Sequence, residues 1–174
     1  MRRPVDASRV REFLRALGAE AREDAHVYLT GGTTAVLVGW RESTVDLDIK
    51  MVPERDSVFR AIARLKEELE VNVELAAPSD FIPELPGWEV RSPFIVREGK
   101  LDFFHYDPYS QALSKLQRGH AKDLADVREM IERGLVEPAK AMELFEAIQG
   151  QLHRFPSIDP GSFRRRVEEA LRGG

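Results

Sequence analysis

One short stretch carries most of the structural information in this chain: YLTGGTTAVLV at residues 28–38, followed by VDLDI at residues 45–49. Residues 26–30 have the composition of a short strand, and the two glycines that follow permit a tight turn. The next residues begin a helix, and after a second turn a strand is expected over residues 45–52. The stretch therefore predicts a strand, a turn, a short helix and a second strand in close succession.

The second of these strands carries two carboxylates on one face. Side chains alternate along a strand, so Asp46 and Asp48 project together. The opposite face is expected to enter the core with Val45, Leu47 and Ile49. Two carboxylates at this spacing repel each other unless a cation lies between them, and Mg²⁺ prefers oxygen ligands. The pattern predicts a magnesium site.

A third acidic residue follows on the next predicted strand, residues 71–75. There the alternation points Val71, Val73 and Leu75 inward and Asn72 and Glu74 outward. If this strand lies beside the Asp-x-Asp strand, Glu74 joins the aspartates. Three carboxylates on a sheet face suit a two-metal site, in which one ion activates an attacking hydroxyl and the other neutralises a triphosphate.

The glycine turn upstream is suited to phosphate. Gly31 and Gly32 have no side chains, so the backbone there can be approached closely. The first amides of the following helix, together with the hydroxyls of Thr33 and Thr34, can donate hydrogen bonds to phosphate oxygens. The turn and the carboxylates together predict a binding site for a nucleoside triphosphate and its metal ion.

The rest of the pattern divides the chain into two parts. Up to about residue 106 helical and strand patterns alternate, and from Asp107 onward the pattern is helical only. We therefore expect an α/β (α+β) fold. Residues 1–106 should form a core with a small mixed sheet flanked by helices, and residues 107–174 a helical bundle that packs on this core.

Local signals place the other elements. The first part should hold a helix from Ser8 to Gly18, a helix capped by Asp56 or Ser57, an irregular loop at 76–89 and a hairpin turning at Glu98-Gly99. The second part should hold helices that follow Asp107, Gly119, Pro138 and Pro160. Three aromatic side chains are expected to pack the sheet onto helices and not to stack on bases: Phe94, Phe103 and Phe104.

Composition narrows the classes of function. The net charge of −4 gives no overall attraction to nucleic acid or acidic lipid, and the absence of cysteine excludes disulfides and thiolate chemistry. The first residues lack the apolar run of a signal peptide, and no segment approaches eighteen consecutive apolar residues. We therefore expect a cytoplasmic protein with no membrane partner.

The segment over residues 28–50 resembles the signature of the DNA polymerase β-like nucleotidyltransferase superfamily. The pattern Gly31-Gly32-Thr33 … Arg41-x-Ser43-x-x-Asp46-x-Asp48 is similar to the small bacterial nucleotidyltransferases of abortive-infection and toxin–antitoxin systems. The resemblance implies a minimal nucleotidyltransferase core. It assigns nucleotide binding to Gly31, Gly32, Thr33 and Ser43, and metal binding and catalysis to Asp46, Asp48 and Glu74.

A second group of charged residues lies in the helical part, KLQRGHAKDLAD at residues 115–126. One interpretation is an ordinary solvated surface with weak ion pairs. The other is that Lys115 reaches the triphosphate while Asp123 and Asp126 hold basic or base-contacting groups in place. The toxin-like relatives carry a similar stretch, which favours nucleotide binding by Lys115 and Asp123. His105 and His120 are expected to be structural or surface residues, and the arginines at 164–166 are a weaker candidate for contact with RNA.

The function that the sequence predicts is metal-dependent nucleotidyl transfer. An acceptor hydroxyl, from an RNA 3′ end (tRNA-like) or a protein side chain, attacks the α-phosphate of a nucleoside triphosphate, and pyrophosphate leaves. The toxin-like resemblance favours RNA and implies a cognate toxin or antitoxin partner. Two alternatives stay open: an antitoxin-type transferase that adds AMP to a partner protein, and a non-catalytic nucleotidyltransferase-like module that binds a nucleotide or partner.

Overall fold

The computed structural model describes residues 3–172, and the chain divides into two compact units. The first unit is Met1–Ala77 with Ser92–Tyr106, and the second is Pro78–Arg91 with Asp107–Gly174. The sequence predicted an irregular loop at 76–89 within the α/β part. In the structure this segment holds two short helical turns, η1 (Pro78–Asp80) and α4 (Trp88–Arg91), and both contact α5 (Pro108–Arg118) of the helical unit.

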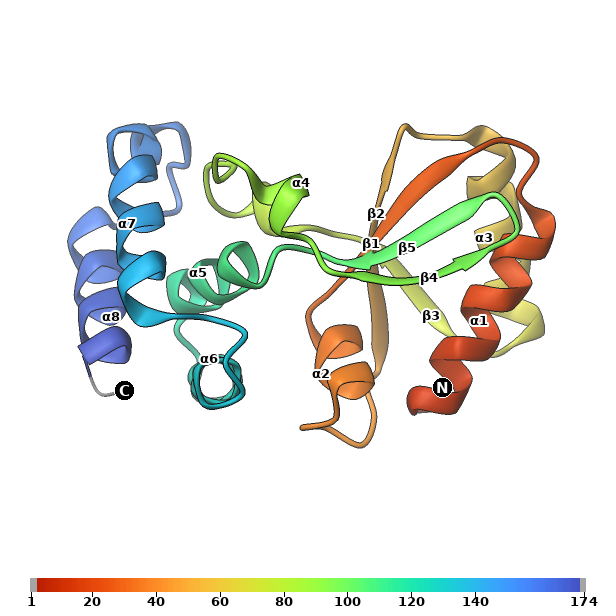
Figure 1. The fold of residues 1–174 in the computed structure, drawn as a ribbon, viewed down its shortest axis with the longest axis horizontal. Helices are drawn as coiled ribbons and strands as arrows, with labels where there is room; N and C mark the ends of the chain where they lie inside the picture. The colour runs from red at the N-terminus through yellow and green to blue at the C-terminus, as the bar shows by residue number, and fades with distance from the viewer. Residues whose placement is uncertain (1–2, 173–174) are drawn as a thin grey trace. The chain divides into compact units, whose positions relative to one another are not determined.

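The first unit is built on a five-stranded mixed sheet in the order β3-β2-β1-β5-β4 (Figure 1). Strand β1 pairs antiparallel with β2 and parallel with β5, β2 pairs parallel with β3, and β4 and β5 form an antiparallel hairpin. This is the small mixed sheet that the sequence predicted. The strands are β1 (Ala25–Thr30), β2 (Asp46–Val52), β3 (Asn72–Leu75), β4 (Phe94–Glu98) and β5 (Leu101–His105).

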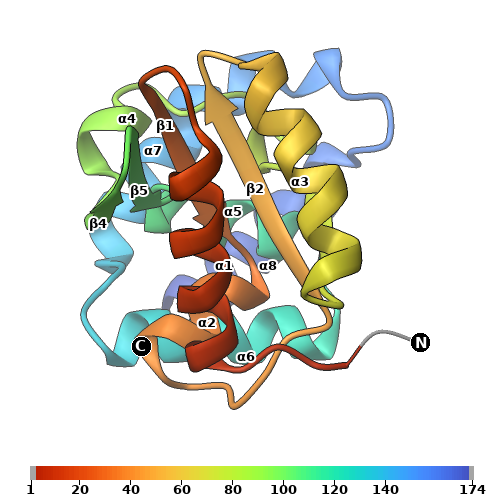
Figure 2. The same cartoon turned by 90° about the vertical axis from the view of Figure 1, so that its right-hand side faces the viewer.

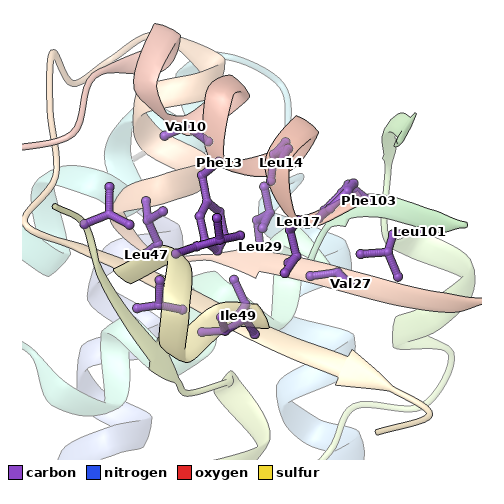
Figure 3. Close-up of a cluster of buried hydrophobic side chains, with 14 of the residues drawn as sticks. Val10, Phe13, Leu14, Leu17, Val27, Leu29, Leu47, Ile49, Leu101 and Phe103 are labelled. Atoms are coloured by element: carbon purple, nitrogen blue, oxygen red, sulfur yellow. The ribbon is translucent and has the colours of Figure 1, made fainter. Parts of the chain in front are cut away.

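Helices cover one face of this sheet. Figure 2 shows α1 (Ala7–Glu20) and α3 (Asp56–Glu68) on the same side of β1 and β2, and the two helices contact each other. The apolar stripes of both helices and the inward side chains of the strands form one buried cluster (Figure 3). Its members include Val10, Phe13, Leu14, Leu17, Val27, Leu29, Leu47, Ile49, Val58, Ile62, Leu65, Leu101 and Phe103. Burial of this apolar surface fixes which face of each strand is left for polar side chains.

Several local predictions were wrong. Asp6, and not Ser8, caps α1, and α3 is preceded by Arg55 without a side-chain cap. Val45 and Leu75 were expected in the core, but they are 66% and 60% exposed. Val45 precedes the first residue of β2, so strand alternation does not apply to it, and Leu75 is the last residue of the edge strand β3. Gly18 does not end the first helix. It is buried inside α1, where an added Cβ would lie 2.7 Å from the backbone carbon of Glu98.

The second unit is helical, as predicted. Besides α5 it contains α6 (Ala121–Glu132), α7 (Pro138–Ile148), the 3₁₀ segment η2 (Gln149–Arg154) and α8 (Pro160–Arg172). Asp107 caps α5 by accepting hydrogen bonds from the amides of Tyr109 and Ser110. Phe145 and Phe163 pack edge to face in the interior, with ring centroids 5.0 Å apart. Within residues 3–172, no helix is long and apolar enough to cross a membrane.

Candidate functional site

The glycine turn joins β1 to α2 (Gly32–Val38) and lies directly against one carboxylate. Gly31 has φ +65°, in the left-handed region that favours glycine, and a Cβ added there would lie 2.9 Å from Oδ2 of Asp48. The pairing of β1 with β2 explains this closeness, because Thr30 is directly opposite Asp48. The turn that the sequence predicted for phosphate therefore touches a carboxylate that it predicted for metal.

Asp46 and Asp48 share the face of the sheet opposite the helical core. Leu47 and Ile49 alternate with them and are buried, whereas both aspartates are partly exposed. Asn72 of the neighbouring strand pairs with Asp46 and donates a hydrogen bond to its Oδ1. The sequence placed Asn72 on this face but gave it no role. The signal for a role was that Asn72 and Glu74 are two residues apart, as Asp46 and Asp48 are, so that each can face one aspartate on the neighbouring strand.

Glu74 lies beside Asp48 in the β2–β3 register, on the same face. It is exposed, and the residues that the structure describes contain no group of three or more acidic or histidine side chains close enough to hold a metal. Strand β3 lies beside β2, which is the condition on which the sequence made Glu74 a third ligand. The role of Glu74 as a third ligand stays a prediction.

The chemistry of the two aspartates still fits Mg²⁺. This ion commonly takes one or two carboxylates from the protein and completes its octahedral shell with water and substrate phosphate oxygens. Asp46 and Asp48 supply two carboxylates on one face, and the backbone of the adjacent turn lies directly against Asp48 because Gly31 has no side chain. A complete protein cage is not required for such a site.

The positively charged side chain of Arg41 also lies at the glycine turn. A Cβ added at Gly32 would collide with the side chain of Thr44 and lie 3.1 Å from Nη1 of Arg41. Thr44 is held by a two-way backbone bridge to Val5 and donates from its hydroxyl to the Asp46 carbonyl at 3.0 Å. Arg41 was noticed in the sequence only as part of a spacing, and its position beside Gly32 gives the turn a positive charge suited to phosphate. Ser43 is half-buried in the same loop.

The threonines of α2 face the interior. Thr33 is fully buried, and its Oγ1 has no hydrogen-bond partner among the described residues. Thr34 donates from its hydroxyl to the Leu29 carbonyl at 3.3 Å and is 3.1 Å from Nδ1 of His105. The predicted contact of Thr33 with phosphate is thus untested, and its unpaired hydroxyl is the feature that a ligand or water would satisfy.

His105 is a structural residue of the first unit. It lies opposite Leu29 on the helix-covered face of the sheet, away from the face of Asp46 and Asp48. Burial, with a smaller contribution from the charge of Arg11, lowers the pKa of His105 from 6.5 to about 4. The imidazole is therefore neutral at physiological pH.

The second predicted group lies within the helical unit, and its charges are paired there. Lys115 is buried in an ion pair with Asp126, with Nζ 2.8 Å from Oδ2. Arg118 pairs with Asp123 at 2.6 Å, and the second oxygen of Asp123 has no hydrogen-bond partner in the described part of the chain. Neither interpretation of the sequence foresaw a buried pair, because helical spacing alone does not show burial. Nucleotide binding by Lys115 and Asp123 stays a prediction.

The arginines of α8 have partners in the same unit. Arg166 donates to the carbonyls of Leu116 and Gln117, at the end of α5, and Arg164 pairs with Glu168 at 2.8 Å. These contacts give two of the three arginines a structural role. His120 is exposed at the start of α6 and makes no side-chain cap.

Comparison with known proteins identifies the family of the chain. Residues 8–149 match the family described as a nucleotidyltransferase of unknown function, DUF6036. The crystal structure of an antigenic nucleotidyltransferase-like protein from Paracoccidioides brasiliensis has a similar fold, with a TM-score of 0.53 and 13% sequence identity over 98% of this chain and 95% of the other. No curated protein matches the chain. At this identity the structural likeness concerns the fold alone.

Proposed function

The chain belongs to the nucleotidyltransferase family DUF6036, and we propose that it transfers a nucleoside monophosphate from a nucleoside triphosphate to an acceptor hydroxyl, with release of pyrophosphate. One observation carries the proposal. The side-chain-free turn at Gly31 lies against the carboxylate of Asp48, and Asp46 is on the same face one strand repeat away. A triphosphate bound at the turn would have its phosphates next to both carboxylates.

Each residue of this site has a task in the proposal. Gly31 and Gly32 let the turn lie against Asp48 and Thr44, its backbone amides would bind the phosphates, and the Arg41 guanidinium beside Gly32 would offset their negative charge. Asn72 holds the Asp46 carboxylate in one orientation. Asp46 and Asp48 would hold Mg²⁺, which supplies neutralisation of the phosphate charge and activation of the attacking oxygen when bound. Positioning and charge neutralisation account for most of the rate acceleration in phosphoryl-group chemistry.

The test is transfer of label from each of the four α-³²P nucleoside triphosphates, with Mg²⁺, to bulk RNA or to lysate protein. Asp46→Asn and Asp48→Asn should each lower transfer by a factor on the order of 10² or more, because each removes a carboxylate ligand of the Mg²⁺ that would neutralise the phosphate charge. Glu54→Gln, at an exposed carboxylate in the loop after β2, is the control and should transfer at the wild-type rate. Transfer that survives both aspartate substitutions would overturn the proposal.

The acceptor defines the finer function. Label that migrates with RNA would support a toxin-like transferase, and label on protein would support the antitoxin-type AMP-transferase. Expression of the chain in a bacterial host, with and without the protein encoded by the adjacent gene, tests the toxin role. Growth arrest that requires Asp46 and is relieved by the neighbour is the outcome expected for a toxin.

A non-catalytic module is the second candidate, and one observation favours it. Within the described residues, Glu74 does not form a metal-holding group with the two aspartates. Equilibrium binding of a labelled triphosphate separates the candidates. Binding that depends on Gly31 and Arg41, without transfer to any acceptor, would identify the module.

A further inference from the structure

The sheet face that carries Asp46 and Asp48 continues across β1, β5 and β4 as a row of aromatic rings. Tyr28 and His26 alternate with buried Val27 and Leu29, so they share the face of Thr30, which is opposite Asp48. Phe104 is opposite Tyr28 on β5, and Phe94 is opposite Phe104 on β4. We call His26, Tyr28, Phe104 and Phe94 the aromatic row.

The rings of the aromatic row contact one another. Tyr28 and Phe104 are stacked with centroids 5.2 Å apart, His26 is 5.0 Å from Phe104, and Phe94 meets Phe104 edge to face at 5.7 Å. Phe103, the other aromatic residue of β5, points to the opposite face and is fully buried in the helical core. The sequence expectation that Phe94 and Phe104 pack the sheet onto helices was therefore wrong for these two.

The outer part of the row is open to solvent. Phe94 is 59% exposed, and the side chain of His26 is half-exposed. An exposed cluster of apolar rings on a sheet face that otherwise carries charged side chains is a mark of a binding surface. Tyr28 at the inner end is buried, so the accessible rings are those of His26, Phe104 and Phe94.

The charges around the row suit a nucleic-acid backbone at the inner end. Lys50 is opposite Tyr28, between the row and the aspartates. Asp102 lies next to His26 on the same face, and its charge is offset by Arg97, whose Nη1 is 3.0 Å from Oδ2. Arg97 also pairs with Asp24 at 3.0 Å. Lys50 is thus the cation of this face that lies between the acidic site and the rings.

We propose that the accessible rings of the aromatic row, those of His26, Phe104 and Phe94, stack on unpaired bases of a single-stranded nucleic-acid acceptor whose end reaches Asp46 and Asp48. This inference rests on the proposed function and names its acceptor class. Aromatic faces on a sheet are a general means of holding single-stranded bases, because every base has a π-face. Two residues along a strand span about 7 Å, which separates the buried Tyr28 from the position opposite Asp48, and the accessible ring of Phe104 lies level with Tyr28 on the next strand.

The extent of the row favours the acceptor strand over the base of the triphosphate. The rings lie on three adjacent strands, which are spaced about 4.8 Å apart, so the row spans about 10 Å. A single base covers one ring, whereas consecutive bases of a strand can use several. The row also extends away from the glycine turn, because β5 and β4 lie on the side of β1 opposite to β2.

The test is binding of a fluorescein-labelled single-stranded ten-nucleotide RNA by the full chain, measured by fluorescence anisotropy in EDTA so that no transfer occurs. Phe94→Ala and Phe94→Leu should weaken binding about 5- to 150-fold, the range for loss of one stacked base. Phe94→Tyr retains an aromatic face and should bind as the wild type does. Leu75→Ala, at an exposed apolar residue on the helix side of β3, is the matched control and should leave the affinity unchanged.

The outcomes separate this inference from the proposed function. Asp46→Asn should bind the oligonucleotide normally while losing label transfer, and this would support both. No binding of the single strand, equal binding by Phe94→Ala, or an equal dependence on Phe94 for a fully paired duplex would overturn the inference. If the inference fails in one of these ways, transfer of label to a protein would still uphold the proposed function. If the chain binds the single strand through Phe94 but transfers label to no acceptor, the proposed function alone is overturned.

Discussion

The buried ion pair between Lys115 and Asp126 allows a quantitative test of what Lys115 does. The two side chains are 7% and 5% exposed, and Nζ lies 2.8 Å from Oδ2. Removing one partner of such a pair leaves a buried charge uncompensated, which costs about 3–5 kcal/mol. We therefore expect Lys115→Met and Asp126→Asn each to lower the free energy of unfolding by about 3–5 kcal/mol, and the melting temperature by roughly 6–20 °C.

The double substitution removes both charges and should cost much less than the sum of the single ones. Urea unfolding followed by circular dichroism gives the four free energies of this cycle, and we expect a coupling of at least about 2 kcal/mol. A single Lys115→Met variant within 1 kcal/mol of the wild type would refute the reasoning. The same cycle tests nucleotide binding. If Lys115 contacts the triphosphate, the double variant should regain stability but not triphosphate affinity, whereas a purely structural pair predicts that both return.

Three further predictions concern the first unit. Gly31→Ala should lower the free energy of unfolding by about 1–2 kcal/mol and weaken triphosphate binding, because it places a Cβ at positive φ against Asp48; unchanged titration calorimetry with a nucleoside triphosphate would contradict this. Gly18→Ala should lower the free energy of unfolding by about 1–3 kcal/mol, although alanine usually stabilises a helix relative to glycine, because the added methyl group would collide with the Glu98 backbone. A higher melting temperature in thermal unfolding would contradict this and show that the β4–β5 hairpin can shift to make room. For His105 the folded pKa of about 4 lies below the unfolded value of 6.5. The contribution of His105 to the free energy of unfolding is therefore complete above pH 6.5 and is lost as the pH falls towards 4. The loss should be about 3 kcal/mol, and it should be missing from the pH profile of His105→Gln; parallel profiles for the two proteins would refute the assignment.

Much of the first unit was predictable because its elements are decided locally. The alternation of Leu47 and Ile49 with Asp46 and Asp48 allows one face to be buried and the other to carry the acids. The glycine pair needs no tertiary information to form a turn. The exposure of Val45 and Leu75 could not be predicted, because it depends on where the ladder of strand β2 begins and on which strand is at the edge.

The helical unit was predictable in its elements but not in its contacts. The pair Asp107-Pro108 predicts the start of a helix, and α5 begins there, with Asp107 as its N-cap. The assignment of 78–91 to this unit depends on burial of Ile82, Leu85 and Trp88, and prolines and a glycine in the segment gave no sign of it. The Lys115–Asp126 pair joins α5 to α6, and a helical face that looks solvated in sequence can be buried by a neighbouring helix.

The sequence by itself determined the fold class, the glycine turn and the common face of Asp46 and Asp48, because each follows from the geometry of one strand or one turn. Apart from the β4–β5 hairpin, which the turn at Glu98-Gly99 predicts, tertiary structure alone decided which strands are neighbours. The order β3-β2-β1-β5-β4 places Glu74 beside Asp48, Gly31 against the Asp48 carboxylate and the aromatic row on the same face as the acids. Strand pairing joins residues far apart in the chain through burial of a shared core, and no local pattern encodes that choice.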